Sequence, residues 1–161
     1  TQVGVLANQA LGWMASGKVP HRMGNGHANL VPYQAFQARD GELIIAVGND
    51  SQFRKLCGVL GLDYCADPRF ATNPQRVVNR AALIPLLEAA IRQWAKADLY
   101  EALEAEGVPA GPINSVDEVF ADPQVVARGM KIARDGLPGI ATPIMIDGER
   151  MAADRASPRR P

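Results

Sequence analysis

The residues best suited to contact a substrate lie in one short polar segment of the chain. Its glycines let a backbone approach a ligand closely, and its asparagine and histidine side chains supply hydrogen-bond donors at the same place. A plainer interpretation is that these two side chains only satisfy backbone groups of the loop. Polar clusters in loops are more often functional than polar groups in a core, which favours binding. The predicted substrate-binding residues are Gly24, Asn25, Gly26 and His27.

Three arginines form a second group of candidate ligand-binding residues. Arg69, Arg76 and Arg80 lie along a proline-containing stretch and the residues that follow it. Guanidinium groups bind phosphates and carboxylates well. The alternatives are that these arginines bridge the irregular stretch to the following helix, or contact another subunit, and we favour these two roles.

Neither metal nor redox chemistry is indicated. His21 has no partner at the spacing of metal ligands. Cys57 and Cys65 are the only cysteines and lack the CxxC spacing. We expect two reduced thiols, as in a cytoplasmic protein. No metal site is predicted.

The composition argues against several classes of partner. The 17 basic residues balance the 17 acidic residues, and the apolar fraction of 47% indicates a globular fold. We therefore expect no nucleic-acid partner and no anionic membrane surface as a partner. No apolar run approaches the roughly 20 residues that a transmembrane helix needs, and the first residues lack the pattern of a signal peptide. The expected location is the cytoplasm.

Hydrophobic periodicity places the polar segment between a helix and a hairpin. Residues 2–16 have helical periodicity and end at a glycine. After a loop over 17–32, residues 33–38 alternate and residues 43–47 form a continuous apolar run. These two strands are separated by the hairpin signal Asp40-Gly41. The apolar run is expected to be buried on both of its faces.

Several helices are predicted downstream, with their first residues marked by capping side chains. Asp50 is the expected cap of one helix and Asn79 of another, in which Pro85 predicts a kink or a late start. The sequence Ser115-Val116-Asp117-Glu118 has the capping-box pattern, and Asp122 is expected to cap a further turn. The remaining predictions are an irregular segment over 62–78 and strands over 130–134 and 142–146. The fold class is α/β: a small mixed domain with a short, mainly antiparallel sheet and helices.

Five motifs occur in a recognisable order along the chain. They occupy residues 22–36, 46–57, 67–80, 107–114 and 122–129. In this order and spacing they resemble the class III CoA-transferases, which include formyl-CoA transferase, carnitine-CoA transferase-like proteins and the related acyl-CoA racemases. The resemblance runs from residue 1 to about residue 154 and is closest to the dicarboxylate-CoA transferase branch.

The resemblance implies a reaction in which coenzyme A moves from an acyl-CoA to a carboxylic acid. In the family an aspartate is the nucleophile and forms an anhydride and then an aspartyl-CoA thioester, which divides one high barrier into smaller ones. By the resemblance this aspartate lies upstream of Thr1, so we expect no catalytic residue in this chain and an inactive fragment. No cofactor is expected, because the coenzyme A thioester is itself a substrate. The aspartates assigned instead to turns and caps are Asp40, Asp50, Asp67 and Asp122.

The resemblance also implies a domain organisation. Residues 1–20 correspond to a helix and linker of a large domain that is absent from the chain, residues 21–150 to a small domain, and residues 151–161 to a linker tail. Residues 24–29 correspond to a glycine-rich lid that shields hydrolysable intermediates from water. The glycines are not consecutive here, which puts the mobility of the lid in question. The family forms intertwined homodimers, so a homodimer is expected.

Two other functions stay open at this stage. One is a fragment of a racemase, which abstracts a proton beside the thioester carbonyl and whose catalytic residues would also lie upstream. The other is a freestanding, non-catalytic binding or assembly domain. A nucleophilic aspartate encoded upstream of Thr1 would separate the transferase from this last possibility.

Overall fold

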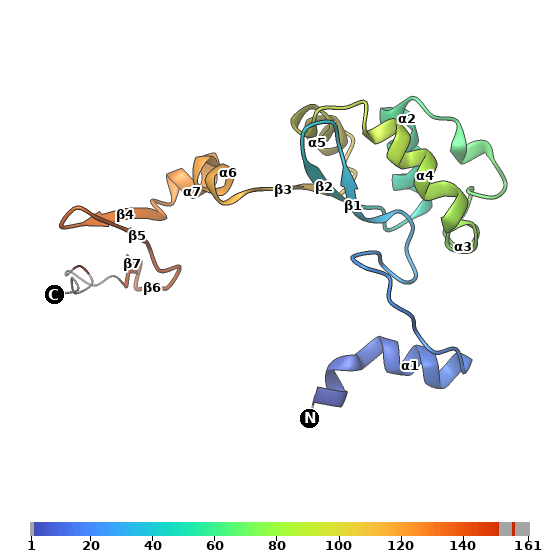
Figure 1. Ribbon diagram of the computed structural model, residues 1–161, viewed down its shortest axis with the longest axis horizontal. Helices are drawn as coiled ribbons and strands as arrows, with labels where there is room; N and C mark the ends of the chain where they lie inside the picture. The colour runs from blue at the N-terminus through green and yellow to red at the C-terminus, as the bar shows by residue number, and fades with distance from the viewer. Residues whose placement is uncertain (1, 152–155, 157–161) are drawn as a thin grey trace. The chain divides into compact units, whose positions relative to one another are not determined.

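The computed structural model describes residues 2–151 and residue 156 (Figure 1). It divides into two compact units, Thr1–Pro112 and Ile113–Pro161. The linker tail predicted for residues 151–161 lies almost entirely outside the described residues. The fold is mixed α/β with short sheets whose assigned strand pairings are antiparallel, as the sequence predicts.

The first unit holds a sheet of three strands in the order β1-β2-β3 and the longest helices. Strand β1 pairs with β2 in antiparallel register, with Phe36 opposite Leu43. Since Ala38 N–H donates to Gly41 O at 2.8 Å, the turn predicted at Asp40-Gly41 is confirmed. The elements are η1 (Gln2–Leu6), α1 (Ala7–Ser16), β1 (Tyr33–Gln37), β2 (Glu42–Ala46), α2 (Asp50–Leu60), η2 (Tyr64–Ala66), α3 (Asn73–Val78), α4 (Arg80–Ile91), α5 (Lys96–Ala105) and β3 (Ala110–Ile113).

One face of this sheet packs on the core and the other is open. Phe36, Leu43 and Ile45 are buried, whereas Ile44 is 42% exposed. The prediction that 43–47 is buried on both faces is therefore wrong. Side chains alternate along a strand, and the helical side chains of the core meet only the face that carries Phe36.

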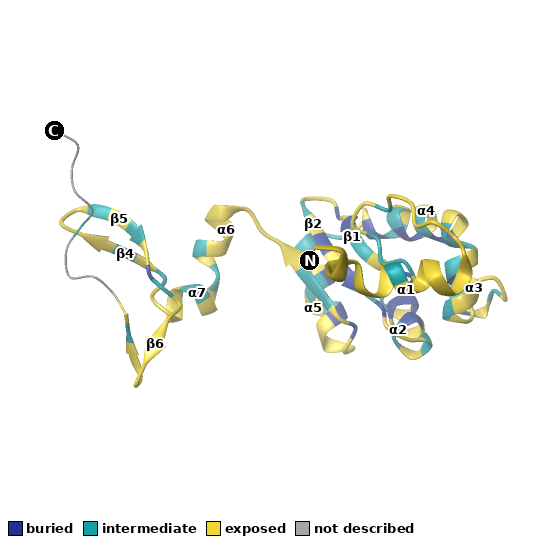
Figure 2. Ribbon diagram, turned by 90° about the horizontal axis from the view of Figure 1, so that it is seen from below, coloured by how far each residue is buried: buried dark blue, intermediate teal, exposed yellow. Residues whose placement is uncertain are grey.

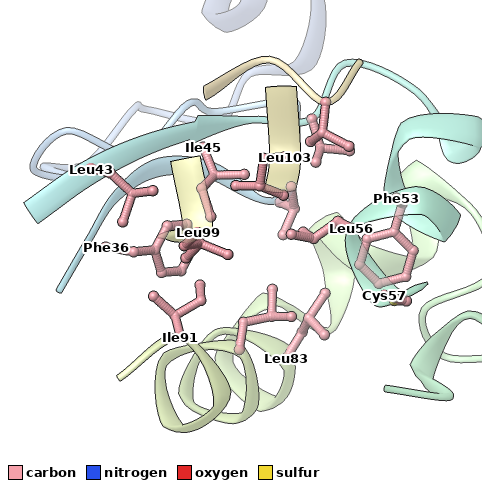
Figure 3. Packing of buried hydrophobic residues seen from close by; sticks show 14 of the residues in the cluster. Phe36, Leu43, Ile45, Phe53, Leu56, Cys57, Leu83, Ile91, Leu99 and Leu103 are labelled. Carbon is pink, nitrogen blue, oxygen red and sulfur yellow. The ribbon is translucent and has the colours of Figure 1, made fainter. Parts of the chain in front are cut away.

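The core is built by α2, α4 and α5 against that face (Figure 3). Spacings of three and four residues put the apolar side chains of each helix on one side. Figure 2 shows the buried residues gathered in this part of the chain. The fully buried apolar residues of α2, α4 and α5 are Phe53, Leu56, Cys57, Leu83, Leu87, Ile91, Leu99 and Leu103.

Most helix ends fall where the sequence places them, and two differ. Gly17 and Gly61 end α1 and α2 in left-handed conformations. Asn49, not Asp50, caps α2, because its side chain accepts from Gln52 N–H at 2.9 Å. Helix α4 begins at Arg80, directly after Asn79, but the Asn79 side chain makes no capping hydrogen bond. Since α4 continues through Pro85, the late start that was one of the two expectations for this proline does not occur.

The segment predicted to be irregular contains two helical pieces, η2 and α3. A proline at the start of α3 is tolerated because the first N–H groups of a helix have no partner inside it. The prediction of an irregular segment over 62–78 is therefore wrong for η2 and α3, since Pro74 lies in the first turn of α3.

The second unit contains two short helices and two hairpins. Ser115 N–H donates to Glu118 Oε2 at 2.8 Å, as the capping-box pattern predicts. Asp122 caps the next helix by accepting from Gln124 and Val125 N–H. The strand predicted over 142–146 is mostly wrong, because only Met145–Ile146 is extended and pairs. The elements are α6 (Val116–Ala121), α7 (Pro123–Ala127), β4 (Lys131–Arg134), β5 (Leu137–Ile140), β6 (Met145–Ile146) and β7 (Glu149–Arg150).

Helix α1 has no buried residue among the described part of the chain. Leu11 and Met14 are 67% and 70% exposed. The assignment of residues 1–20 to a large domain stays a prediction. No helix within the described residues is long and apolar enough to cross a membrane.

Candidate functional site

His27 is held by hydrogen bonds inside its own loop. Its Nδ1 accepts from the backbone N–H of Asn29 and of Leu30, each at 3.1 Å. Its backbone N–H donates to Tyr33 O at 2.9 Å, at the start of β1. The imidazole stacks on the Tyr33 ring, with 5.2 Å between centroids and 19° between planes. Because a nitrogen that accepts carries no proton, the ring holds its proton on Nε2.

The residues before the histidine set the turn that presents it. Gly24 has a φ of +60°, a left-handed angle that suits glycine. Asn25 Oδ1 accepts from Ala35 N–H at 3.2 Å, so this side chain ties the loop to β1. A Cβ added to Gly26 would lie 3.2 Å from Arg80 Nη1. A larger residue at this position would have to displace the Arg80 guanidinium or Met23 O by a few tenths of an ångström.

Arg80, the first residue of α4, holds the same loop from a second element. Its Nη2 donates to His27 O at 2.5 Å and to Ala28 O at 3.1 Å. The side chain is partly buried, and this burial lowers the pKa of the guanidinium group. An arginine stays charged in proteins even so. A positive charge therefore lies against the backbone of the predicted binding segment.

Asn73 and Arg76 of α3 hold the end of the loop. Asn73 accepts from Val31 N–H at 3.1 Å through Oδ1 and donates to Asn29 O at 2.8 Å through Nδ2. Arg76 Nε donates to Val31 O at 2.7 Å. Its two other nitrogens donate to Phe70 O at 3.0 Å and to Asp50 Oδ1 at 2.8 Å. The loop is thus anchored to α3 as well as to β1 and α4.

The three arginines make structural contacts, but among the described residues none of their side chains bridges the stretch predicted to be irregular to the helix that follows it. Arg76 joins Phe70 to α3, and both lie inside the stretch predicted to be irregular. Arg80 instead holds the loop at residues 27 and 28. Arg69 pairs at the surface with Asp67, at 2.6 Å. The side chain of Arg76 is fully buried, so its guanidinium group is not accessible to a ligand from solvent.

Two side chains of the polar segment satisfy backbone groups, and substrate binding by the segment stays a prediction. Asn25 Oδ1 and His27 Nδ1 satisfy backbone N–H groups, as the plainer interpretation holds. Nε2 of His27 and the hydroxyl of Tyr33 have no hydrogen-bond partner within the described residues. The Tyr33 residue as a whole is 37% exposed. Tyr33 was missed because it reads as an ordinary strand residue, and Asn73 because it lies far along the chain.

Each of the four aspartates assigned to turns and caps accepts hydrogen bonds from groups of the protein. Asp40 Oδ1 accepts from Lys96 N–H at 2.7 Å, at the start of α5. Asp50 accepts from Asn73 N–H at 2.8 Å. For Asp67, the hydrogen bonds from Arg69 lower the pKa of the carboxyl group, and Asp122 caps α7.

The cysteines belong to the packing of α2 and η2. Burial, with a smaller effect from neighbouring Cys65, raises the pKa of the Cys57 thiol to about 11. A thiol with such a pKa is a poor nucleophile. Across the described residues, no group of three or more His, Cys, Asp or Glu side chains is placed to hold a metal ion.

Comparison with protein families gives a match over almost the whole chain. The model of CoA-transferase family III matches residues 1–160. The chain belongs to CoA-transferase family III. The motif at residues 22–36, which carries His27 and Tyr33, is therefore part of a family III sequence.

Two curated CoA-transferases are similar to the chain. The succinate–glutarate CoA-transferase of Agrobacterium fabrum is 46% identical over 98% of the chain and 41% of its own length. The acetyl-CoA:oxalate CoA-transferase of Acetobacter aceti is 38% identical over 89% of the chain and 37% of its own length. The chain thus spans about two fifths of the length of these relatives.

A solved structure gives the same family assignment. The crystal structure of a CaiB/BaiF family protein from Brucella suis superposes with a TM-score of 0.84 at 55% identity. It covers 97% of this chain, which spans 42% of that protein. The mixed fold of the family III chain agrees with this relative.

Proposed function

We propose that the protein containing this chain transfers coenzyme A from an acyl-CoA to a dicarboxylic acid. The observation that carries the proposal is the family III match over residues 1–160. Both relatives described above are named for CoA transfer, one with succinate and glutarate and the other with oxalate. These three acids each carry two carboxyl groups, so a dicarboxylate is the substrate class to test first.

The proposed chemistry uses a carboxylate nucleophile that lies outside residues 1–161. This carboxylate attacks the thioester carbonyl of the donor, the C–S bond breaks, and an anhydride and CoA thiolate form. The thiolate then attacks the anhydride, which releases the donor acid and leaves an enzyme-bound CoA thioester. The acceptor carboxylate repeats the two steps in reverse, and its own CoA thioester leaves. The contacts of Asp40, Asp50, Asp67 and Asp122 support a nucleophile elsewhere, because these four side chains hold caps, turns and an arginine.

The segment Gly24, Asn25, Gly26 and His27 is proposed to contact the substrates. Its anchors on β1, α3 and α4 favour a fixed wall of the site over a freely moving lid. A fixed wall excludes water from the anhydride and the thioester without having to close at each turnover. The proposal also includes a homodimer in the cytoplasm, with no cofactor besides the coenzyme A substrate.

Intact-mass spectrometry tests this function. The complete protein is incubated with succinyl-CoA, and residues 1–161 are treated in parallel. We expect a CoA adduct on the complete protein, no adduct on residues 1–161, and glutaryl-CoA after glutarate is added. An adduct on residues 1–161 would show that the nucleophile lies in this chain.

Two further results would replace the proposal. Exchange of the hydrogen beside the thioester carbonyl for solvent deuterium, with no adduct and no glutaryl-CoA, would indicate a racemase. Absence of adduct, transfer and exchange would indicate a non-catalytic binding module.

A further inference from the structure

We infer that His27 and Tyr33 together bind a carboxylate group of the acceptor acid through Nε2–H of the imidazole and Oη–H of the phenol. The inference rests on the proposed function and deepens it, because it assigns the acceptor site to two named donor atoms. It adds Tyr33, a strand residue, to the loop segment predicted from the sequence.

The first argument is that both donors are available. His27 Nδ1 is occupied by the N–H groups of Asn29 and Leu30, which leaves Nε2–H as the only free polar group of the ring. The ring of Tyr33 stacks on His27, and its hydroxyl has no hydrogen-bond partner within the described residues. The two rings are nearly parallel, so two donors stand on neighbouring rings. A carboxylate has two oxygens that can each accept such a donor.

The second argument is that the donors are fixed before a ligand arrives. Two backbone N–H groups hold the imidazole in one tautomer and one orientation. The stacked Tyr33 sits on β1, whose pairing with β2 fixes the backbone. Groups that are already ordered lose little conformational entropy on binding, which raises affinity for a small ligand. Carboxylate binding at this pair would therefore not require the loop to rearrange.

The third argument concerns charge. Arg80 places its guanidinium against the carbonyl groups of His27 and Ala28. This single cation favours an anion beside the loop, while the contacts themselves come from uncharged donors. The phosphates of coenzyme A would be matched better by several cationic side chains than by two neutral donors. A carboxylate is the better match to this arrangement.

Three substitutions distinguish hydrogen-bond donation to a ligand from the structural role that His27 and Tyr33 have in the loop. In His27→Asn, the side-chain oxygen replaces Nδ1 as the acceptor for the loop N–H groups, as asparagine does in Asx turns, but the Nε2 donor is lost. In His27→Gln, the longer amide carries a donor toward the Nε2 position and loses the Nδ1 acceptor. Tyr33→Phe keeps the stacked ring and removes only the hydroxyl.

The experiment measures KM for glutarate and for succinyl-CoA in the complete protein and in each variant. A lost hydrogen bond to a charged group corresponds to roughly a ten- to hundredfold change in affinity. We expect His27→Asn and Tyr33→Phe to raise KM for glutarate by about this factor and to leave KM for succinyl-CoA within about twofold. His27→Gln should retain more glutarate affinity than His27→Asn.

Several results would overturn the inference. They are an unchanged KM for glutarate in His27→Asn and Tyr33→Phe, an equal rise of KM for both substrates, and a larger loss of glutarate affinity in His27→Gln than in His27→Asn.

Calorimetric titration of glutarate into the same proteins separates this inference from the proposed function. Glutarate binding that weakens in the variants, in a protein without transferase activity, would support the site and contradict the function. Active CoA transfer, with equal glutarate binding in the wild type and all variants, would support the function and contradict the site.

Discussion

Arg76 carries a guanidinium group into the core of the first unit and places its nitrogens on oxygens from three segments. The acceptors are Val31 O, Phe70 O and Asp50 Oδ1. Its guanidinium carbon also lies 4.3 Å from the centre of the Phe53 ring. Since no nitrogen is left without a partner and the side chain is fully buried, this residue joins the loop, α2 and α3 as one structure.

We predict that Arg76→Met destabilises the protein by about 3 kcal/mol. The substitution keeps most of the apolar volume but leaves buried carbonyl oxygens without donors, each costing about 1–3 kcal/mol. The Asp50 side chain is 41% exposed, so water can replace the hydrogen bond that its carboxylate loses. The measurement is urea unfolding followed by circular dichroism. Arg69→Ala, which removes an exposed pair, is the control and should leave the midpoint unchanged. Equal midpoints for both variants would contradict the role given to Arg76.

At the residue scale, the sequence predicted the polar loop but not what holds it. Asn25 and His27 stand out because polar side chains and glycines alternate within four positions. Asn73 and Arg76 bond to loop residues more than forty positions away. Periodicity and capping rules describe neighbours along the chain, so they do not reveal such contacts. Tyr33 could be read as a strand residue, yet its stacking on His27 depends on the path of the intervening loop.

Helix α2 contains two glycines whose roles follow from their backbone angles. Gly58 lies inside the helix, and an added Cβ would meet nothing within 4 Å. Gly61 ends the helix at a φ of +66°, where its N–H donates to Gly58 O at 3.2 Å. The first position favours alanine, because glycine weakens helix interiors. The second favours glycine, because other residues are strained there.

We therefore predict opposite effects for the same substitution in one helix. Gly58→Ala should raise the free energy of unfolding by about 0.5–1 kcal/mol. Gly61→Ala should lower it by about 1 kcal/mol, because alanine has to adopt a left-handed conformation. Urea unfolding of the two variants beside the wild type measures both effects. A loss of stability in Gly58→Ala would show that α2 does not have the open surface described at this position.

The elements themselves show where pattern reading works. Capping residues located α6 and α7 well, and Gly61 located the end of α2, because these helix ends are set by local hydrogen bonds. The burial of both faces predicted for β2 was wrong, since an apolar run does not indicate whether one face or both faces of the sheet are covered by other elements. Strand β5 was missed because it contains a proline and a glycine, which usually mark turns.

On the scale of the whole chain, the core is confined to a continuous stretch of sequence. Its buried cluster runs from Val31 to Val108. Of the described hydrophobic residues that are buried, Ala141 alone lies outside that stretch. Burial of apolar surface is the main favourable term in folding. The stability of the first unit should therefore depend little on residues 1–20 or on the second unit.

We predict that residues 21–112 fold on their own. The fragment keeps β1, β2, α2, α4 and α5, and with them the whole buried cluster. It should show one cooperative urea transition by circular dichroism and resist limited proteolysis. Residues 21–95 are the matched control, because they lack α5 and its buried Leu99 and Leu103. Loss of two buried leucines costs about 4–10 kcal/mol, which is comparable to the total stability of a small domain, so this shorter fragment should not unfold cooperatively. A gradual, non-cooperative transition for residues 21–112 would mean that the core needs support from outside the stretch that contains it.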